Sequence, residues 1–165
     1  MLGKACGEIQ DLDMVINDRA YTMTSIEEAI RRQYNKGALD FVVIDYLQLI
    51  KNTNKYGSRE QEVADISRTL KVLSLELKIP ILALCQLNRA SLMNKGKEPT
   101  LADLRESGSL EQDADNVFFL FNSQDDQEGN IIDVTCKIAK QRAGEIGKVY
   151  LKFNKLKQQF FGVEI

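Results

Sequence analysis

Apolar and polar residues follow two different periods along this chain, and those periods predict its elements. Three runs are apolar without alternation: FVVI from Phe41, ILALCQL from Ile81 and NVFFLF from Asn116. Such runs are typical of strands that are buried on both faces of a parallel sheet. Between the first two runs, apolar residues recur at helical spacing at Val63, Ile66, Leu70, Leu73 and Leu77. The pattern therefore predicts strands joined by helices, as in an α/β protein.

A first helix is predicted near the start of the chain. The sequence MVIND, residues 14–18, has the composition of a short strand. Thr24, with Glu27 three residues later, has the signature of a capping box that begins a helix. Gly37 is suited to ending that helix. Its apolar face is expected to consist of Ile26, Ala29, Ile30 and Tyr34.

Polar segments bound the long second helix on both sides. Residues 51–57, KNTNKYG, predict a loop before it, and Ser58 with Gln61 predicts its cap. Pro80 follows its end, because proline cannot continue a helix.

After residue 131 the chain changes to three short strands, DVTCKIAK, KVYLKF and QFFGVEI, joined by short turns. They predict an antiparallel extension of a mostly parallel sheet flanked by helices, all within one domain of residues 1–165.

Composition narrows the function classes. The 165 residues are 44% hydrophobic and 28% charged, with a net charge of −2, so bulk charge does not attract the chain to nucleic acid. The sequence has no histidine, which excludes histidine-based acid–base catalysis and the usual zinc sites. Cys6, Cys85 and Cys136 are widely spaced and predict reduced thiols. Because the sequence has no apolar run near ~18 residues, we expect a cytoplasmic protein that spans no membrane.

Polar residues follow two of the predicted strands at their carboxyl ends, where ligands bind in open α/β sheets. Asp45 comes directly after FVVI, and its carboxylate suits a Mg²⁺ ion bound to a nucleotide. An aspartate at this place also serves as a turn residue or a helix cap. Gln86, in the run Gln86–Arg89, has an amide that suits the terminal phosphate of a nucleotide or its attacking water. The alternative for this run is a polar cluster that begins a loop.

Two cations, Lys140 and Arg142, lie on a turn between two of the C-terminal strands, with one residue between them. On an extended segment, side chains two positions apart project the same way. The fork of an arginine and the point charge of a lysine together suit a phosphate group. The alternative is a solvated hairpin tip.

The order and spacing of these segments resemble the ATPase domain of the DnaB-type hexameric replicative DNA helicases, from about Met14 to the end of the chain. IDYLQLI resembles their Walker B motif, and QLNR resembles their sensor strand. DLRESGSLEQDAD, residues 103–115, is similar to their most recognisable run. KQRAGEIG, residues 140–147, resembles the turn that carries their phosphate finger. The resemblance implies a RecA-like P-loop NTPase core.

The resemblance also implies a role for each candidate residue. Asp45 would hold Mg²⁺, and Gln86 would couple the state of the nucleotide to the DNA-binding loop. Lys140 and Arg142 would reach the γ-phosphate of ATP that is bound by the neighbouring subunit of a hexameric ring. The implied cofactors are ATP and Mg²⁺. The implied partners are single-stranded DNA, further copies of the same subunit, primase and a helicase loader.

Candidate DNA contacts follow from the same resemblance. Arg105, Glu106 and Gly108 fall where the family lines its central channel and grips the backbone of single-stranded DNA. The Arg105 guanidinium and the Gly108 N–H suit a phosphate, whereas the Glu106 carboxylate does not. Glu106 would therefore act through its N–H or by orienting Arg105. The alternative for Glu106 and for Glu111 is helix capping and surface charge.

A phosphate loop of the form GxxxxGK[ST] does not occur in these 165 residues, because the Gly-Lys pairs at residues 3 and 96 precede alanine and glutamate. In the family this loop lies upstream, so we expect negligible ATP hydrolysis by the chain alone. We expect the strands that lack a neighbour to pair directly, ILALCQL with NVFFLF, or to associate with another copy. Two other functions stay open: a different RecA-like ATPase, such as a relative of the recombinases, and a non-enzymatic module that joins or regulates a helicase ring. The run DLRESGSLEQDAD favours the helicase.

Overall fold

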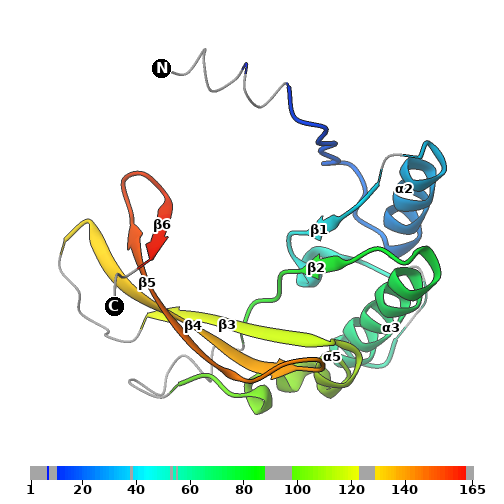
Figure 1. Cartoon of the computed structure of the whole chain (residues 1–165). Helices are drawn as coiled ribbons and strands as arrows, with labels where there is room; N and C mark the ends of the chain where they lie inside the picture. Colours follow the sequence, from blue (N-terminus) through cyan, green and yellow to red (C-terminus); the bar gives the residue numbers. More distant parts are fainter. Residues whose placement is uncertain are drawn as a thin grey trace.

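The chain folds into a parallel pair of strands and a separate four-stranded antiparallel sheet, with helices beside and between them (Figure 1). The computed structural model describes residues 7, 11–37, 39–52, 54, 56–87, 98–122 and 129–162, except for the side chains of residues 105–107. In Figure 1 the helices α2 and α3 lie beside the parallel pair, and the antiparallel sheet extends away from them. The helix α5 contacts α3 where the two parts meet.

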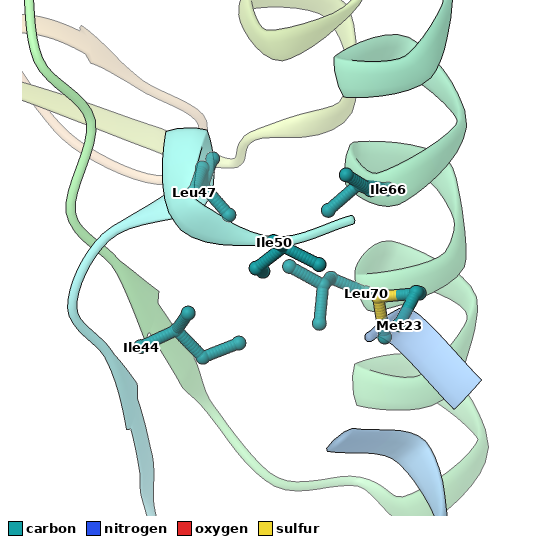
Figure 2. Close-up of a cluster of buried hydrophobic side chains, with 6 residues drawn as sticks. All are labelled: Met23, Ile44, Leu47, Ile50, Ile66 and Leu70. Carbon is teal, nitrogen blue, oxygen red and sulfur yellow. The ribbon is translucent and has the colours of Figure 1, made fainter. Parts of the chain in front are cut away.

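The parallel pair consists of β1 (Val42–Ile44) and β2 (Ile81–Ala83), which lie in register along their whole length. Helices α2 (Met23–Asn35) and α3 (Arg59–Leu77) cover one face of the pair. A short 3₁₀ helix, η1 (Leu47–Leu49), follows β1. Burial of apolar side chains between these elements stabilises this part of the chain. Figure 2 shows the core cluster, which consists of Met23, Ile44, Leu47, Ile50, Ile66 and Leu70.

The other face of the parallel pair is exposed. Val43 and Leu82 are 54% and 42% exposed, whereas the residues beside them in each strand contact the core. Burial also alternates along the strand β3 (Asn116–Asn122), where Phe119 is buried and Phe118 and Leu120 are exposed. The prediction that the three apolar runs are buried on both faces is therefore wrong for the described residues, because each strand is covered on one face.

The long helix α3 has the cap and the core face that the sequence predicts. The side chain of Ser58 accepts a hydrogen bond from the N–H of Gln61 at 3.3 Å. The helix ends at Leu77, after which Lys78 adopts a left-handed conformation with a φ of 57°. Pro80 comes two positions later and begins the path into β2. The buried residues on the predicted face are Val63, Ile66, Leu70, Leu73 and Leu77.

Replacing Leu73 with alanine is expected to lower the free energy of unfolding by about 2–5 kcal/mol, because removing a buried leucine side chain leaves a cavity. Leu73 is 1% exposed and packs between α2 and α3 with Ile30 and Leu77. Val72, on the same helix, is 54% exposed, so Val72→Ala is the matched control and should cost less than about 0.5 kcal/mol. Urea denaturation followed by circular dichroism measures both values. Equal losses in the two variants would contradict this packing.

The helix α2 begins earlier than the sequence predicts, with Thr22 rather than Thr24 as its N-cap. The Thr22 hydroxyl accepts a hydrogen bond from the N–H of Ser25 at 3.2 Å, and the Ser25 hydroxyl accepts one from the N–H of Thr22 at 3.1 Å. Thr22 also forms a parallel bridge with Lys51. This pairing, distant in sequence, fixes where the extended chain ends, so the prediction of Thr24 and Glu27 as the capping box is wrong.

The chain before α2 is exposed at residues 11–19. The predicted strand at residues 14–18 is wrong, because this segment pairs with no other described strand and its apolar side chains are exposed. Gly37 follows α2 with a φ of 80°, as expected for a residue that ends a helix. In the part of the chain that the structure describes, helices long and apolar enough to cross a membrane are absent.

The second half of the chain forms the antiparallel sheet. A 3₁₀ helix, η2 (Leu101–Ser107), and a short α-helix, α5 (Gly108–Asp113), come before it. The sheet order is β3, β4, β5, β6, and the last three strands span Ile131–Gln141, Gly147–Asn154 and Gln159–Gly162. The antiparallel pairing predicted for the last three strands is confirmed. They form a separate sheet with β3, so the prediction that they extend a mostly parallel sheet is wrong for the described residues.

The strand β3 belongs to the antiparallel sheet rather than to the parallel one. Among the described residues it pairs with β4 and not with β2. Strands that are close along the chain pair at a lower entropic cost than distant ones, and β4 follows β3 closely. Direct pairing of ILALCQL with NVFFLF is therefore wrong as a prediction. Association with another copy stays a prediction.

Candidate functional site

Asp45 and Gln86 lie at the same end of the parallel pair, as the sequence predicts. Asp45 comes directly after β1, and Gln86 lies beyond the end of β2. Backbone pairing continues past the two strands, because the N–H of Leu84 donates to the Ile44 carbonyl and the N–H of Leu47 donates to the Leu84 carbonyl, both at 2.9 Å. The side chains of Asp45 and Gln86 are exposed. The fold therefore presents a carboxylate and an amide at one edge.

This edge fits a Mg²⁺ ion that is shared with a nucleotide. In nucleotide sites Mg²⁺ binds one or two carboxylates and takes its other ligands from phosphates and waters. Asp45 offers one exposed carboxylate that is held at the end of a strand. Among the described residues, no group of three or more His, Cys, Asp or Glu side chains could hold a metal ion alone. An ion bound by Asp45 would therefore depend on ligands from the nucleotide.

Lys140 and Arg142 both bond to residues 111–115, which comprise the end of α5 and the link to β3. The Lys140 ammonium group is half-buried and donates to the Glu111 carbonyl at 2.6 Å. The backbone N–H of Arg142 donates to the Asp115 carbonyl at 3.0 Å, and its guanidinium donates to the Asp115 carboxylate at 2.9 Å. The Arg142 side chain is nevertheless 75% exposed. Lys140 lies within β4, so its predicted place on the turn is wrong, whereas Arg142 begins the turn.

Two aspartates of the run DLRESGSLEQDAD fix the same segment to α3. Asp113 is 9% exposed and accepts a hydrogen bond from the Ser67 hydroxyl at 2.9 Å. Asp115 accepts one from the Lys71 ammonium group at 2.5 Å, in addition to its bond with Arg142. The partners on α3 lie 46 and 44 positions away in the sequence. No local spacing indicates this pairing, so neither aspartate is among the residues that the sequence singles out.

The pKa of the Asp115 carboxyl should lie below its ordinary value. The hydrogen bond from Lys71 lowers the pKa of the Asp115 carboxyl below its ordinary value of 3.8, partial burial opposes this, and the charge of Arg142 lowers the pKa further. A carboxyl whose pKa is lowered by folding adds stability above its ordinary pKa and loses that contribution as the pH falls through the lowered value. We therefore expect the contribution to be complete well above pH 3.8 and to be lost as the pH falls through the lowered pKa.

NMR titration of the Asp115 carboxyl measures this directly. In the Lys71→Met variant its pKa should rise toward the ordinary value, because the first and largest cause of the shift is gone. Lys36, at the end of α2, provides the matched control, and Lys36→Met should leave the pKa of Asp115 unchanged. An unchanged pKa in the Lys71→Met variant would show that the pair does not form in solution.

The candidate DNA residues lie before and at the start of α5, at the opposite end of this helix from residues 111–113. Gly108 is the first residue of α5 and is exposed. Among the described residues, no atom from elsewhere in the fold lies within 4 Å of where a Cβ atom would be. Arg105 and Glu106 lie in η2, and their side chains are outside the described residues. The end of α5 and the two residues after it, 111–115, bind the two cations of β4 and its turn. One helix therefore joins the candidate DNA segment to the candidate phosphate contacts.

The chain matches known proteins over nearly its whole length. The family model of the DnaB-like helicase C terminal domain matches residues 1–162. The replicative DNA helicase DnaB of Geobacillus stearothermophilus is 40% identical over 169 residues, which cover 99% of this chain and 37% of the relative. The replicative DNA helicase DnaB of Haemophilus influenzae is 42% identical over 154 residues, which cover 88% of this chain and 32% of the relative. The chain thus spans about a third of the length of these relatives.

Solved structures share its fold. One, described as an ATPase domain, superposes with a TM-score of 0.88 at 38% identity, covering 99% of this chain and 59% of that domain's chain. A DnaB-like replicative helicase, described together with its interactions with primase, also superposes with a TM-score of 0.88 at 38% identity. That match covers 99% of this chain and 41% of the other.

Proposed function

The chain belongs to the DnaB-like helicase C-terminal domain family, and from this premise we propose that it is part of the motor of a replicative DNA helicase. Its fold is the RecA-type fold of the DnaB-like ATPase domains that it matches. In the proposed function, ATP hydrolysis drives movement along single-stranded DNA and separates the duplex. The observation that carries the proposal is the placement of Asp45 and Gln86 at one exposed edge of the parallel pair. A role at replicating DNA implies a cytoplasmic location.

Asp45 and Gln86 hold and orient the nucleotide of their own subunit in this proposal. The Asp45 carboxylate would hold a nucleotide-bound Mg²⁺ ion, and the strand before it fixes the position of the carboxylate. Mg²⁺-bound ATP supplies the phosphoryl group and part of the charge compensation for its transfer. The neutral amide of Gln86 donates to a terminal phosphate oxygen or accepts from the attacking water. The position of the Gln86 side chain therefore changes when the bound ATP is hydrolysed to ADP.

Lys140 and Arg142 complete the nucleotide site of the neighbouring subunit. Arg142 is available to a partner surface, because its side chain is 75% exposed on a turn. Its guanidinium can donate two hydrogen bonds in fixed geometry to phosphate oxygens, and Lys140 adds a second positive charge. Together they stabilise the negative charge of the transferring group. Hydrolysis then depends on a closed ring in which each subunit meets the next, which we propose to be a hexamer.

DNA contacts lie on the segment before and at the start of α5. The N–H of Gly108 and the guanidinium of Arg105 contact backbone phosphates, and Glu106 acts through its N–H or by orienting Arg105. Contacts to phosphates carry no sequence information, which suits a motor that must move along any strand. We also propose primase and a helicase loader as partners. Primase is a partner of the matched DnaB-like helicase according to the description of that structure.

A fusion protein tests the proposal. It joins the part of the Geobacillus stearothermophilus relative that precedes the matched segment, which carries the phosphate loop in this family, to residues 1–165 of this chain. We expect the fusion to hydrolyse ATP with Mg²⁺, to be stimulated by single-stranded DNA and to unwind a forked duplex. We expect negligible turnover by the chain alone, because the backbone groups and lysine of the phosphate loop are not in its sequence. A fusion that forms rings but hydrolyses no ATP would contradict the proposed function.

A further inference from the structure

We infer that Gln48 is a positioning residue for Gln86, and that its side-chain amide takes the place of a backbone peptide at the end of the parallel pair. Gln48 lies in η1, on the segment that follows Asp45. The inference rests on the proposed function, since it concerns how one residue of that nucleotide site is held. Within that site it adds a contact that joins the two strand ends.

The side chain of Gln48 bonds to both backbone groups of Gln86. Its Nε2 donates to the Gln86 carbonyl at 3.0 Å, and its Oε1 accepts from the N–H of Gln86 at 3.2 Å. Nε2 also lies 3.1 Å from the Sγ of Cys85. The reversed amide would set an oxygen against the carbonyl oxygen, so only one orientation satisfies both bonds. Two bonds to the N–H and C=O of one residue are what an adjacent strand provides. We call this pair of bonds the Gln48 clamp.

The clamp lies where backbone pairing between the two strands ends. Before this point Leu84 bonds through its backbone to Ile44 and Leu47. The chain then enters η1, whose first residue, Leu47, makes the last of these backbone bonds. At Gln86, the pairing is made by the side chain of Gln48. The clamp thereby extends the register of the parallel pair to the residue proposed to contact the nucleotide.

The backbone on which Gln48 stands is itself fixed. Leu47 and Ile50 are 2% and 3% exposed and belong to the core cluster in Figure 2. From α3, the Arg59 guanidinium donates to the carbonyl of Gln48 at 2.9 Å and to that of Ile50 at 3.1 Å. Because η1 is held against α3 in this way, the length and the polar groups of the Gln48 side chain determine where Gln86 is held.

The clamp gives Gln86 a defined position relative to Asp45. Asp45 lies between β1 and η1, so one short segment carries both the carboxylate and the clamp. A shift of this segment when nucleotide and metal bind is passed to Gln86 through two hydrogen bonds. Gln48 therefore affects the coupling between the nucleotide site and the DNA-binding segment without contacting the nucleotide. Its loss should affect how the site responds to DNA more than how tightly it binds ATP.

Amide hydrogen exchange in this chain tests the clamp itself. Gln48→Met keeps the length of the side chain and removes both bonds, whereas Gln86→Ala removes a side chain and keeps both. Relative to the intrinsic rates, the amide of residue 86 should exchange on the order of tenfold faster in Gln48→Met. The exchange rate of this amide should be unchanged in Gln86→Ala and in the control variant Gln33→Met on α2. The exchange rate of the Leu84 amide should be unchanged in all three variants. Unchanged exchange at Gln86 in Gln48→Met overturns the inference, whatever the fusion does.

The ATPase of the fusion tests the consequence. Gln48→Met and Gln86→Ala should each lower the stimulation by single-stranded DNA at least about fivefold, with the KM for ATP within about twofold of the parent. Gln33→Met should match the parent. If Gln48→Met speeds exchange at Gln86 but leaves the stimulation intact, the inference is overturned and the proposed function stands. A parent fusion without ATPase contradicts the proposed function instead, and the exchange result still decides the clamp.

Discussion

Replacing Arg142 with alanine is expected to lower the DNA-stimulated kcat of the fusion by about a thousandfold or more, the range found when an arginine that stabilises a transferring phosphoryl group is removed. Arg142 lies on an exposed turn and holds its guanidinium beside the surface carboxylate of Asp115. Loss of an exposed ion pair of this kind costs about 1 kcal/mol of stability or less. Unfolding therefore cannot account for the loss of rate. Arg142→Lys should restore little of it, because lysine lacks the planar fork.

Arg68 supplies the matched control for Arg142. Its side chain is also 75% exposed, and its guanidinium also bonds to an aspartate of the same segment, Asp113, at 3.2 Å. Arg68→Ala removes the same charge and also an ion pair with an aspartate, although Asp113 is more buried than Asp115, and it leaves the turn intact. We expect its kcat to stay within about threefold of the parent. Equal losses in Arg68→Ala and Arg142→Ala would mean that general surface charge, and not a placed guanidinium, supports the rate.

Replacing Asp45 with asparagine is expected to lower kcat at least about a hundredfold, because the side chain keeps its shape and loses the charge that attracts Mg²⁺. Raising the Mg²⁺ concentration should recover part of the activity if the variant binds the ion more weakly. Steady-state ATPase assays over a range of Mg²⁺ concentrations measure both effects. Ring assembly should be unchanged, since Asp45 is exposed and lies outside the core cluster.

Asp40 provides the matched control for Asp45. It is exposed and lies before β1, at the amino end of the strand that Asp45 follows. Asp40→Asn makes the same chemical change at the opposite end of one strand, so its kcat should match that of the parent. Full Mg²⁺-dependent turnover by Asp45→Asn would exclude Asp45 as the metal-holding residue.

The elements that the sequence predicts correctly are those fixed by nearby residues. The core face of α3 follows from helical spacing alone, and its cap follows from Ser58 and Gln61. The antiparallel strands after residue 131 follow from short apolar runs and tight turns. The shared edge of Asp45 and Gln86 follows from a general rule, because the carboxyl ends of parallel strands meet. Each of these depends on contacts between residues close in sequence or on topology common to the fold class.

The elements that the sequence does not predict depend on distant partners. The cap of α2 is at Thr22 because Thr22 pairs with Lys51. The link between Gln48 and Gln86 spans 38 positions, and the bond between Asp115 and Arg142 spans 27. The apolar runs predict burial on both faces, but the structure leaves one face of the parallel pair exposed. Periodicity reports which residues are apolar, and it does not report which neighbours cover them.

Subunit mixing tests the central claim, that Asp45 and Arg142 act on one nucleotide from two neighbouring subunits. Fusions with Asp45→Asn and with Arg142→Ala are each expected to have almost no ATPase. When the two are co-expressed, about a quarter of the interfaces in a random ring join an intact Asp45 to an intact Arg142. The account predicts that the mixed rings regain ATPase well above either variant alone. Mixed rings that stay as inactive as the separate variants would place both residues on the same subunit's nucleotide, or place one of them away from it, and would contradict the account.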